Sequence, residues 1–271
     1  ELEDTLAGPS LSPEAPIPKG AKHRPVWVGV GMLVAGLILS AAWLGPRPKA
    51  VPPREVRVER ITDSVGNEES PAVSPDGKTI AFVAPGGGTR QIWVRLLAAG
   101  TPLQLTHDQS DHLQPRWSPD SSSLIYYSPS GSPAEQGTIW EIPALGGAPH
   151  RIASALGGGD ISHDGGHIAL FERRAERTEL AVVARDGSST ERVHQLPSQS
   201  VYDLPRWAPD DRTVAFHRGQ SGPFADAILI LPVAGGAPKE IAHSAYLRGL
   251  SWLSDGSGLV YASSFGSTVL Y

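Results

Sequence analysis

The sequence predicts an all-β fold, a β-propeller of four-stranded antiparallel blades, on the strength of two observations. The first is a turn that recurs at nearly constant spacing, with its aspartates 44, 44, 46 and 45 residues apart. The second is a set of four short apolar runs within each repeat. A fixed period of roughly 20–50 residues indicates an array of repeated structural units. The five turn aspartates are Asp76, Asp120, Asp164, Asp210 and Asp255.

Each recurring turn has the residue types that reverse a chain between two strands. In the first repeat, Ser74-Pro75-Asp76-Gly77-Lys78 separates one apolar run from the next. Glycine accepts a positive φ, and the aspartate side chain accepts hydrogen bonds from its own backbone. Turn geometry alone therefore explains the repeated aspartates, and we assign all five a structural role.

The four apolar runs of each repeat are expected to pair as one antiparallel sheet. In the second repeat they include Leu124–Tyr127 and Ile139–Ile142. Four antiparallel strands in such a repeat form a propeller blade, and one blade cannot bury both of its faces unless others pack against it. Residues 56–271 therefore predict an incomplete propeller, with four complete blades and a partial fifth. We expect the chain to be part of a longer protein.

Three segments precede the propeller. Residues 1–25, which are rich in Pro and have little apolar material to bury, predict a flexible tail. Residues 45–55 predict a stiff Pro-rich spacer. Val26–Leu44 is uncharged over nineteen residues, roughly 28 Å as a helix, which matches a hydrocarbon core of ~30 Å. We predict a single transmembrane helix in preference to a cleaved signal peptide, whose apolar core is shorter. Small residues spaced by four along it are compatible with weak homodimerisation.

Composition and charge exclude several classes of function. The chain has no cysteine, which removes disulfides, thiolate catalysis and cysteine zinc sites. Its formal net charge is −5, and residues 61–271 carry fifteen Lys and Arg against twenty-two Asp and Glu. A net acidic domain does not attract nucleic acid at long range, so we expect the propeller to bind none.

No catalytic motif is present in the sequence. There is no G-x-S-x-G nucleophile elbow, no protein-kinase signature and no phosphate-binding glycine loop. His163 and His167 suggest a metal site beside Asp160 and Asp164, but they fall on a turn and on the strand after it, so their side chains need not converge. We therefore predict no catalytic residue, no cofactor and no metal in this segment.

Two sets of residues stand out on the first strand of the blades. Trp117, Trp207 and Trp252 occupy one aligned position, and we expect them in the core between blades; a ring of aromatic recognition residues is the alternative. Arg116 and Arg206 each lie one residue earlier and therefore point to the other face of the strand. They are our candidates for lining the channel or its mouth and for contacting a partner.

These repeats resemble the TolB-type β-propeller, a relative of the WD-repeat propellers. The resemblance is carried by Pro71–Phe82 and by the strings Pro115–Asp120 and Pro205–Asp210, each with a Pro-Asp turn. His163 in the third repeat and Ser254 in the fifth replace the turn proline. We expect looser turns in those two blades.

The order of tail, membrane helix, spacer and propeller is similar to that of bacterial membrane-bound regulators. The resemblance implies a non-catalytic sensory or protein-interaction module, preceded by a Ser/Thr kinase-like effector or, alternatively, a winged-helix DNA-binding domain. It also implies location in the cytoplasmic membrane with the propeller outside the cytoplasm, although the basic residues flanking the span do not favour that orientation. Two other hypotheses are a TolB-like envelope scaffold and the N-terminal propeller of a prolyl-peptidase-type hydrolase.

Overall fold

The fold was analysed in a computed structural model that describes residues 66–98, 100–132, 135–197, 200–219, 226–244, 246–263 and 269–270. All of them belong to one compact unit, Arg60–Tyr271. The predicted tail, membrane helix and spacer lie outside the described residues and stay predictions. Among the described residues, no helix has the length and apolarity needed to cross a membrane.

The described part of the chain is all β, as predicted, and every strand pairs antiparallel with its sequence neighbour. The first sheet has the order β1-β2-β3-β4, with β1 (Glu69–Val73), β2 (Thr79–Gly86), β3 (Thr89–Leu96) and β4 (Leu103–Gln104). The second has the order β5-β6-β7-β8, with β5 (Leu113–Trp117), β6 (Ser123–Ser128), β7 (Gly137–Pro143) and β8 (His150–Ala155).

The remaining strands repeat this arrangement. The third sheet contains β9 (Asp160–Ile161), β10 (His167–Arg174), β11 (Arg177–Ala184) and β12 (Thr190–Leu196), and the fourth β13 (Val201–Trp207), β14 (Thr213–Gly219), β15 (Asp226–Pro232) and β16 (Lys239–Ser244). The fifth has three strands, β17 (Leu247–Trp252), β18 (Leu259–Ser263) and β19 (Val269–Leu270). The described residues therefore form four complete blades and a partial fifth.

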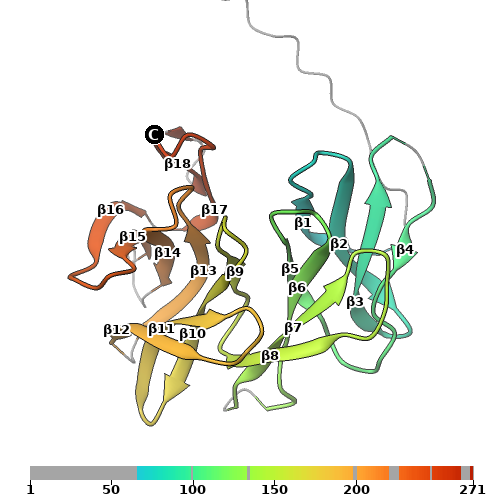
Figure 1. Cartoon of the computed structure of the whole chain (residues 1–271), viewed down its shortest axis with the longest axis horizontal. Helices are drawn as coiled ribbons and strands as arrows, with labels where there is room; N and C mark the ends of the chain where they lie inside the picture. Colours follow the sequence, from blue (N-terminus) through green and yellow to red (C-terminus); the bar gives the residue numbers. More distant parts are fainter. Residues whose placement is uncertain are drawn as a thin grey trace, which may run out of the picture. The chain divides into compact units, whose positions relative to one another are not determined.

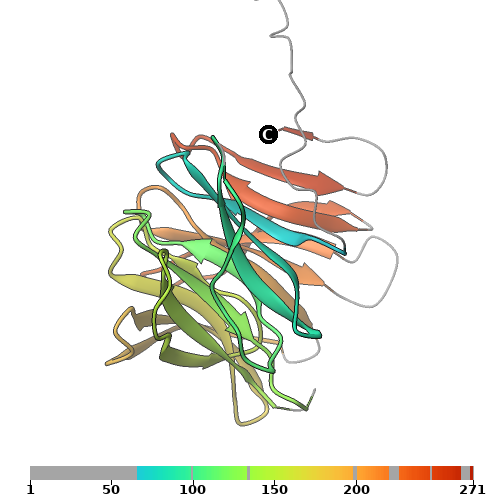
Figure 2. The same cartoon turned by 90° about the vertical axis from the view of Figure 1, so that its right-hand side faces the viewer.

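The blades are arranged around their first strands. Contacts join β1 to β5, β5 to β9, β9 to β13 and β13 to β17. Figure 1 shows these first strands toward the centre, with the fourth strands β4, β8, β12 and β16 at the periphery. Figure 2, turned by 90°, shows the blades as separate twisted layers. This is the radial arrangement of a propeller.

Four hydrophobic clusters fill the boundaries between successive blades. Strand β6 shows how one strand serves two of them. Leu124 and Tyr126 pack with the first blade, whereas Ile125, on the opposite face, packs with the third. Successive side chains of a strand point to opposite faces of its sheet, so an unbroken apolar run is what a blade between two neighbours requires.

Candidate functional site

A cavity of about 400 Å³ opens where the first strands of the blades converge. All five blades contribute to its wall, among other residues through Pro75, Arg116, Asp160, Arg206 and Ser251. The volume lies within the range of small-ligand sites, which is roughly 300–1,000 Å³. We call it the channel cavity.

Three charged residues of the channel cavity occupy the same position of three successive repeats. Arg116, Asp160 and Arg206 each lie four residues before the aspartate of their own turn. Because the first strands are neighbours around the axis, this position places a cation, an anion and a cation in sequence along the wall. The two arginines that the sequence suggested as channel-lining residues are thus both on the cavity wall.

Arg206 is held by the backbone. Arg206 is buried, with only 7% of its surface exposed. Its Nε donates to the carbonyl oxygen of Leu250 at 3.0 Å, and one Nη donates to that of Pro205 at 2.6 Å. Two of its five N–H donors are therefore used within the scaffold, which fixes the guanidinium in place.

Arg116 is the less constrained of the two arginines. It is partly buried, and no hydrogen bond joins its side chain to any other residue in the described ranges. Burial lowers the pKa of Arg116, while the charges of Asp160 and Asp203 act in the opposite direction. Its guanidinium lines the cavity with its donors available.

Asp160 was noted in the sequence only beside His163 and His167, and it was not expected at this site. One of its carboxylate oxygens accepts a hydrogen bond from the backbone N–H of Trp207 at 2.9 Å. Burial raises its pKa to about 6, against the opposing influence of Arg116 and of that hydrogen bond. The sequence does contain a signal for Asp160 at this site. It occupies the same repeat position as Arg116 and Arg206 and carries the opposite charge.

The three aligned tryptophans lie between blades, as expected. Trp207 is 4% exposed and belongs to the core cluster of the third and fourth blades. Each indole also donates to a carbonyl oxygen of the preceding blade, and the three acceptors again share one repeat position. The pairs are Trp117 with Ala72 at 2.9 Å, Trp207 with Asp160 at 3.1 Å, and Trp252 with Arg206 at 3.1 Å. The same rings line the channel cavity.

Gln114 links three blades beside the axis. Its amide nitrogen donates to Asp203 of the fourth blade at 3.3 Å, and its amide oxygen accepts from the backbone of Gly158, in the third, at 2.6 Å. Its φ is +52°, and the pairing of β5 with β6 shifts register beside it. A bulge of this kind redirects a side chain, and here it turns Gln114 toward the neighbouring blades.

The repeated aspartates are found in the turns, where they bond their own backbone. Each accepts from the amide two residues later, at distances between 2.8 and 3.1 Å. In the first three blades a buried serine two residues earlier, Ser74, Ser118 or Ser162, also donates to the aspartate at 2.6 Å. Hydrogen bonds from Ser118 and Ser122 lower the pKa of Asp120 to about 2.

The expectation of looser turns in the third and fifth blades was wrong. In each turn the glycine N–H donates a hydrogen bond to the carbonyl oxygen three residues earlier. This bond is 2.9 Å long for Gly165 and Gly256, compared with 2.8 Å for Gly77. Both glycines have a positive φ, like Gly77. The turn is held by the aspartate and by the residue after it, so the replaced proline is dispensable.

The two histidines of the candidate metal site lie on the turn of the third blade and on the strand that follows it. His163 is exposed and lies with Nδ1 3.3 Å from Asp211 of the next blade. His167 begins strand β10 and is exposed. Within the described ranges, no group of three or more His, Asp or Glu side chains is placed to hold a metal ion.

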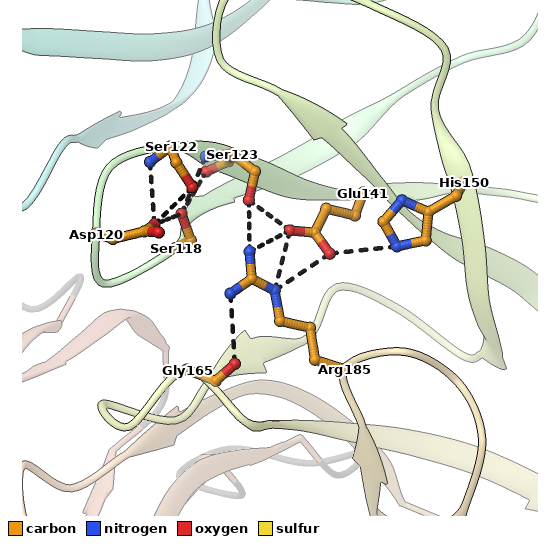
Figure 3. A network of polar contacts seen from close by, with 8 residues as sticks. All are labelled: Ser118, Asp120, Ser122, Ser123, Glu141, His150, Gly165 and Arg185. Atoms are coloured by element: carbon orange, nitrogen blue, oxygen red, sulfur yellow. Dashed lines mark hydrogen bonds and ion pairs between the residues drawn. The ribbon is translucent and has the colours of Figure 1, made fainter.

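A second polar cluster joins the second and third blades away from the first strands (Figure 3). Glu141 is 5% exposed and forms an ion pair with Arg185, which follows β11. Ser123 donates to the same carboxylate, and His150 lies 3.3 Å from its other oxygen. Burial favours the neutral acid, but the hydrogen bonds from Arg185 and Ser123 outweigh it and lower the pKa of Glu141. This cluster stabilises the boundary between the two blades.

Comparison with solved structures identifies the same architecture. The chain is similar to the putative TolB of Agrobacterium tumefaciens, with 22% identity, a TM-score of 0.53, and coverage of 65% of this chain and 66% of that one. TolB of Acinetobacter baumannii has 21% identity, a TM-score of 0.55, and coverage of 69% and 46%. Oligogalacturonate lyase in complex with manganese has 19% identity, a TM-score of 0.56, and coverage of 72% and 58%.

These likenesses concern the fold, because each identity is low. The chain spans between about half and two thirds of the length of the three proteins. The sequence profile of the TolB beta propeller domain matches residues 54–252, more than half of the chain. The turns, the blades and this match lead to one conclusion: the chain belongs to the TolB β-propeller family.

Proposed function

We propose that the propeller is a non-catalytic module that binds a protein or peptide ligand at the mouth of the channel cavity. The observation that carries this proposal is the cavity itself, whose wall combines guanidinium donors with indole rings from three blades. Its polar groups are anchored to backbone partners, as for Arg206 and Asp160. Such groups are suited to holding a ligand, because a rigid site loses little entropy when it binds.

We further propose that this module is the sensory part of a bacterial signalling regulator anchored in the cytoplasmic membrane. The support is the uncharged segment Val26–Leu44, the Pro-rich spacer after it, and the similarity of this order to kinase-linked propellers. In this proposal the propeller lies outside the cytoplasm, and the effector is a Ser/Thr kinase-like domain. A winged-helix effector is the alternative.

The two remaining hypotheses predict different neighbours for this segment. A TolB-like envelope scaffold requires a cleaved leader in place of a retained anchor. The propeller of a prolyl-peptidase-type hydrolase requires a Ser-Asp-His triad after the last blade. The described residues carry no observation that favours either one over the receptor-like regulator.

Site-specific photocrosslinking in the full chain tests the binding role. A benzophenone amino acid replaces His163, whose exposed side chain borders the cavity. The matched control carries it at Arg151, exposed on the outer strand β8. In bacterial cells we expect a discrete protein adduct from position 163 and none from position 151. Equal labelling from both positions, or none from either, would contradict the proposal.

The membrane anchor has an independent test. The full chain should remain in the membrane pellet after alkaline carbonate extraction, and a variant lacking residues 26–44 should be released. Release of the intact chain would reject the anchor without bearing on the channel cavity.

A further inference from the structure

We infer that the channel cavity holds its ligand through one carboxylate group, bound by Arg116 and faced by Asp160, and that Asp160 takes up a proton when this carboxylate binds. This inference rests on the proposed binding function and names its chemistry. Two observations support it. The side chains of the cavity wall have hydrogen-bond donors without partners among the described residues, and Asp160 is the carboxylate that lines the cavity beside the arginines.

The unused capacity of the wall consists mainly of donors. Arg116 has five N–H donors, and none is bonded to another residue of the described ranges. Arg206 uses two donors on carbonyl oxygens. The indole N–H groups of the three tryptophans are already spent on neighbouring carbonyls. A ligand that satisfies such a wall must bring acceptors.

The charged side chains of the wall favour an anionic acceptor of low charge. Arg116 and Arg206 contribute two cations and Asp160 one carboxylate. Asp203, outside this lining, adds a second negative charge near Arg116. His163 also borders the cavity, but it lies against Asp211. A guanidinium binds a carboxylate through two parallel hydrogen bonds, which a planar fork allows and an ammonium does not. The indole rings then provide apolar contact for the rest of the ligand.

Proton uptake follows from the position of Asp160. It is faced by Arg116 from β5, by the Trp207 amide from β13, and by His163 and Asp211 from the turns. Arg206 lines the same cavity. Its pKa is about 6 in the free protein. A second carboxylate bound to Arg116 competes for the same cation and adds a like charge nearby, which raises that pKa further. Binding at neutral pH therefore draws a proton from the buffer to Asp160.

The test uses three short peptides with the full chain in detergent micelles. N-acetyl-Gly-Asp-Gly-amide carries a side-chain carboxylate, N-acetyl-triglycine a terminal one, and N-acetyl-Gly-Asn-Gly-amide none. Binding is followed by tryptophan fluorescence at constant ionic strength, because three indoles line the cavity. We expect one or both carboxylate peptides to bind at least tenfold more tightly than the asparagine peptide, and their order identifies the source of the carboxylate. Equal binding of all three would overturn the inference.

The pH dependence provides the sharper test. Above pH about 6, free Asp160 is ionised and bound Asp160 is protonated, so affinity should fall by up to tenfold per pH unit between pH 6.5 and 7.5. The Asp160→Asn variant should bind more tightly at pH 7.5 and lose this dependence, whereas His163→Gln should keep it. A slope that persists in Asp160→Asn, or that is absent in the unmodified chain, refutes proton uptake.

Variants of Arg116 separate binding from folding. Arg116→Gln should abolish saturation, and Arg116→Lys, which keeps the charge and loses the fork, should weaken binding about tenfold. Arg151→Gln is the matched control and should bind as the unmodified chain does. If Arg116→Gln fails to fold, as judged by circular dichroism, the lysine variant decides. Inorganic phosphate binding more tightly than either carboxylate peptide would also reject the assignment.

The outcomes distinguish this inference from the proposed function. If the position-163 adduct forms and the carboxylate peptides do not bind, the carboxylate assignment is wrong and the binding module stands. If the peptides bind as expected and no adduct forms, the site chemistry is right and the protein-ligand role is wrong.

Discussion

The indole nitrogen of Trp117 donates a hydrogen bond of 2.9 Å to the carbonyl oxygen of Ala72, across the boundary between the first and second blades. Trp207 and Trp252 make the corresponding bond to the blade before them. The contact therefore recurs with the repeat and couples the first strand of one blade to that of the next. A buried carbonyl oxygen left without its donor costs free energy. The hydrogen bond therefore stabilises the packing of one blade against the next.

Replacement of Trp117 by Phe should lower the free energy of unfolding by about 1–2 kcal/mol, because it removes the donor and keeps most of the apolar contact. Urea unfolding measures the change. Trp140→Phe is the matched control, since Trp140 packs against the same cluster without an indole hydrogen bond to another described residue. An equal loss in both variants would show that packing, and not the hydrogen bond, accounts for the effect.

Removal of Arg185 should be more damaging. Arg185→Met leaves the Glu141 carboxylate buried without its cation, and we expect a loss of about 3–5 kcal/mol in urea unfolding at pH 7. The control is Arg218→Met, which breaks a more exposed pair with Glu240 at 3.0 Å. That change should cost no more than about 1 kcal/mol. Similar losses at both sites would contradict the assignment of Glu141 as a buried ion pair.

The same carboxylate predicts a pH dependence at the acid end. The pKa of Glu141 is lower in the folded chain than its ordinary value, so its contribution to stability is present above pH about 4.3 and is lost as the pH falls through the folded pKa. Glu141→Gln should flatten the acid limb of the stability profile. An unchanged acid limb would contradict this assignment and would mean that the aspartates of the turns, rather than Glu141, set the stability at low pH.

Asp160 predicts the opposite slope at higher pH. Its folded pKa of about 6 lies above the ordinary value of about 3.9, so the folded chain binds more protons between these two pH values. The free energy of unfolding should fall as the pH rises through this window, by at most about 1.4 kcal/mol per pH unit. Asp160→Asn should remove that fall and retain an oxygen acceptor for Trp207. Asp186→Asn, at an exposed turn, should leave the fall in place.

The turn serines offer a test with an internal control. Ser118 is buried, donates to Asp120, and accepts from the backbone of Ser123 at 3.0 Å. Ser118→Ala should cost about 1–3 kcal/mol, because it leaves a buried amide without its acceptor. Ser122 donates to the same aspartate at 2.8 Å but is exposed. Ser122→Ala should therefore change stability by less than about 0.5 kcal/mol. Equal costs would mean that the bond to Asp120, and not the buried amide, matters.

Local chemistry made the blades predictable. A turn aspartate between two apolar runs marks each chain reversal, and its repetition counts the blades without any tertiary information. Alternation along each run also assigned Trp117 and Arg116 to opposite faces. The prediction of looser turns at His163 and Ser254 was wrong, because the turn keeps its geometry without a proline at that position.

The sequence by itself therefore determined the repeat, the antiparallel blade, the order of its strands and the placement of the three tryptophans between blades. Each of these depends on residues close together in the chain. Only the tertiary structure decided which distant groups meet: Glu141 with Arg185, Gln114 with Asp203, and Asp160 between two arginines. The physical reason is that closure around the axis brings aligned positions of different repeats together, and burial there, which no single repeat encodes, sets the pKa and the partners of Asp160.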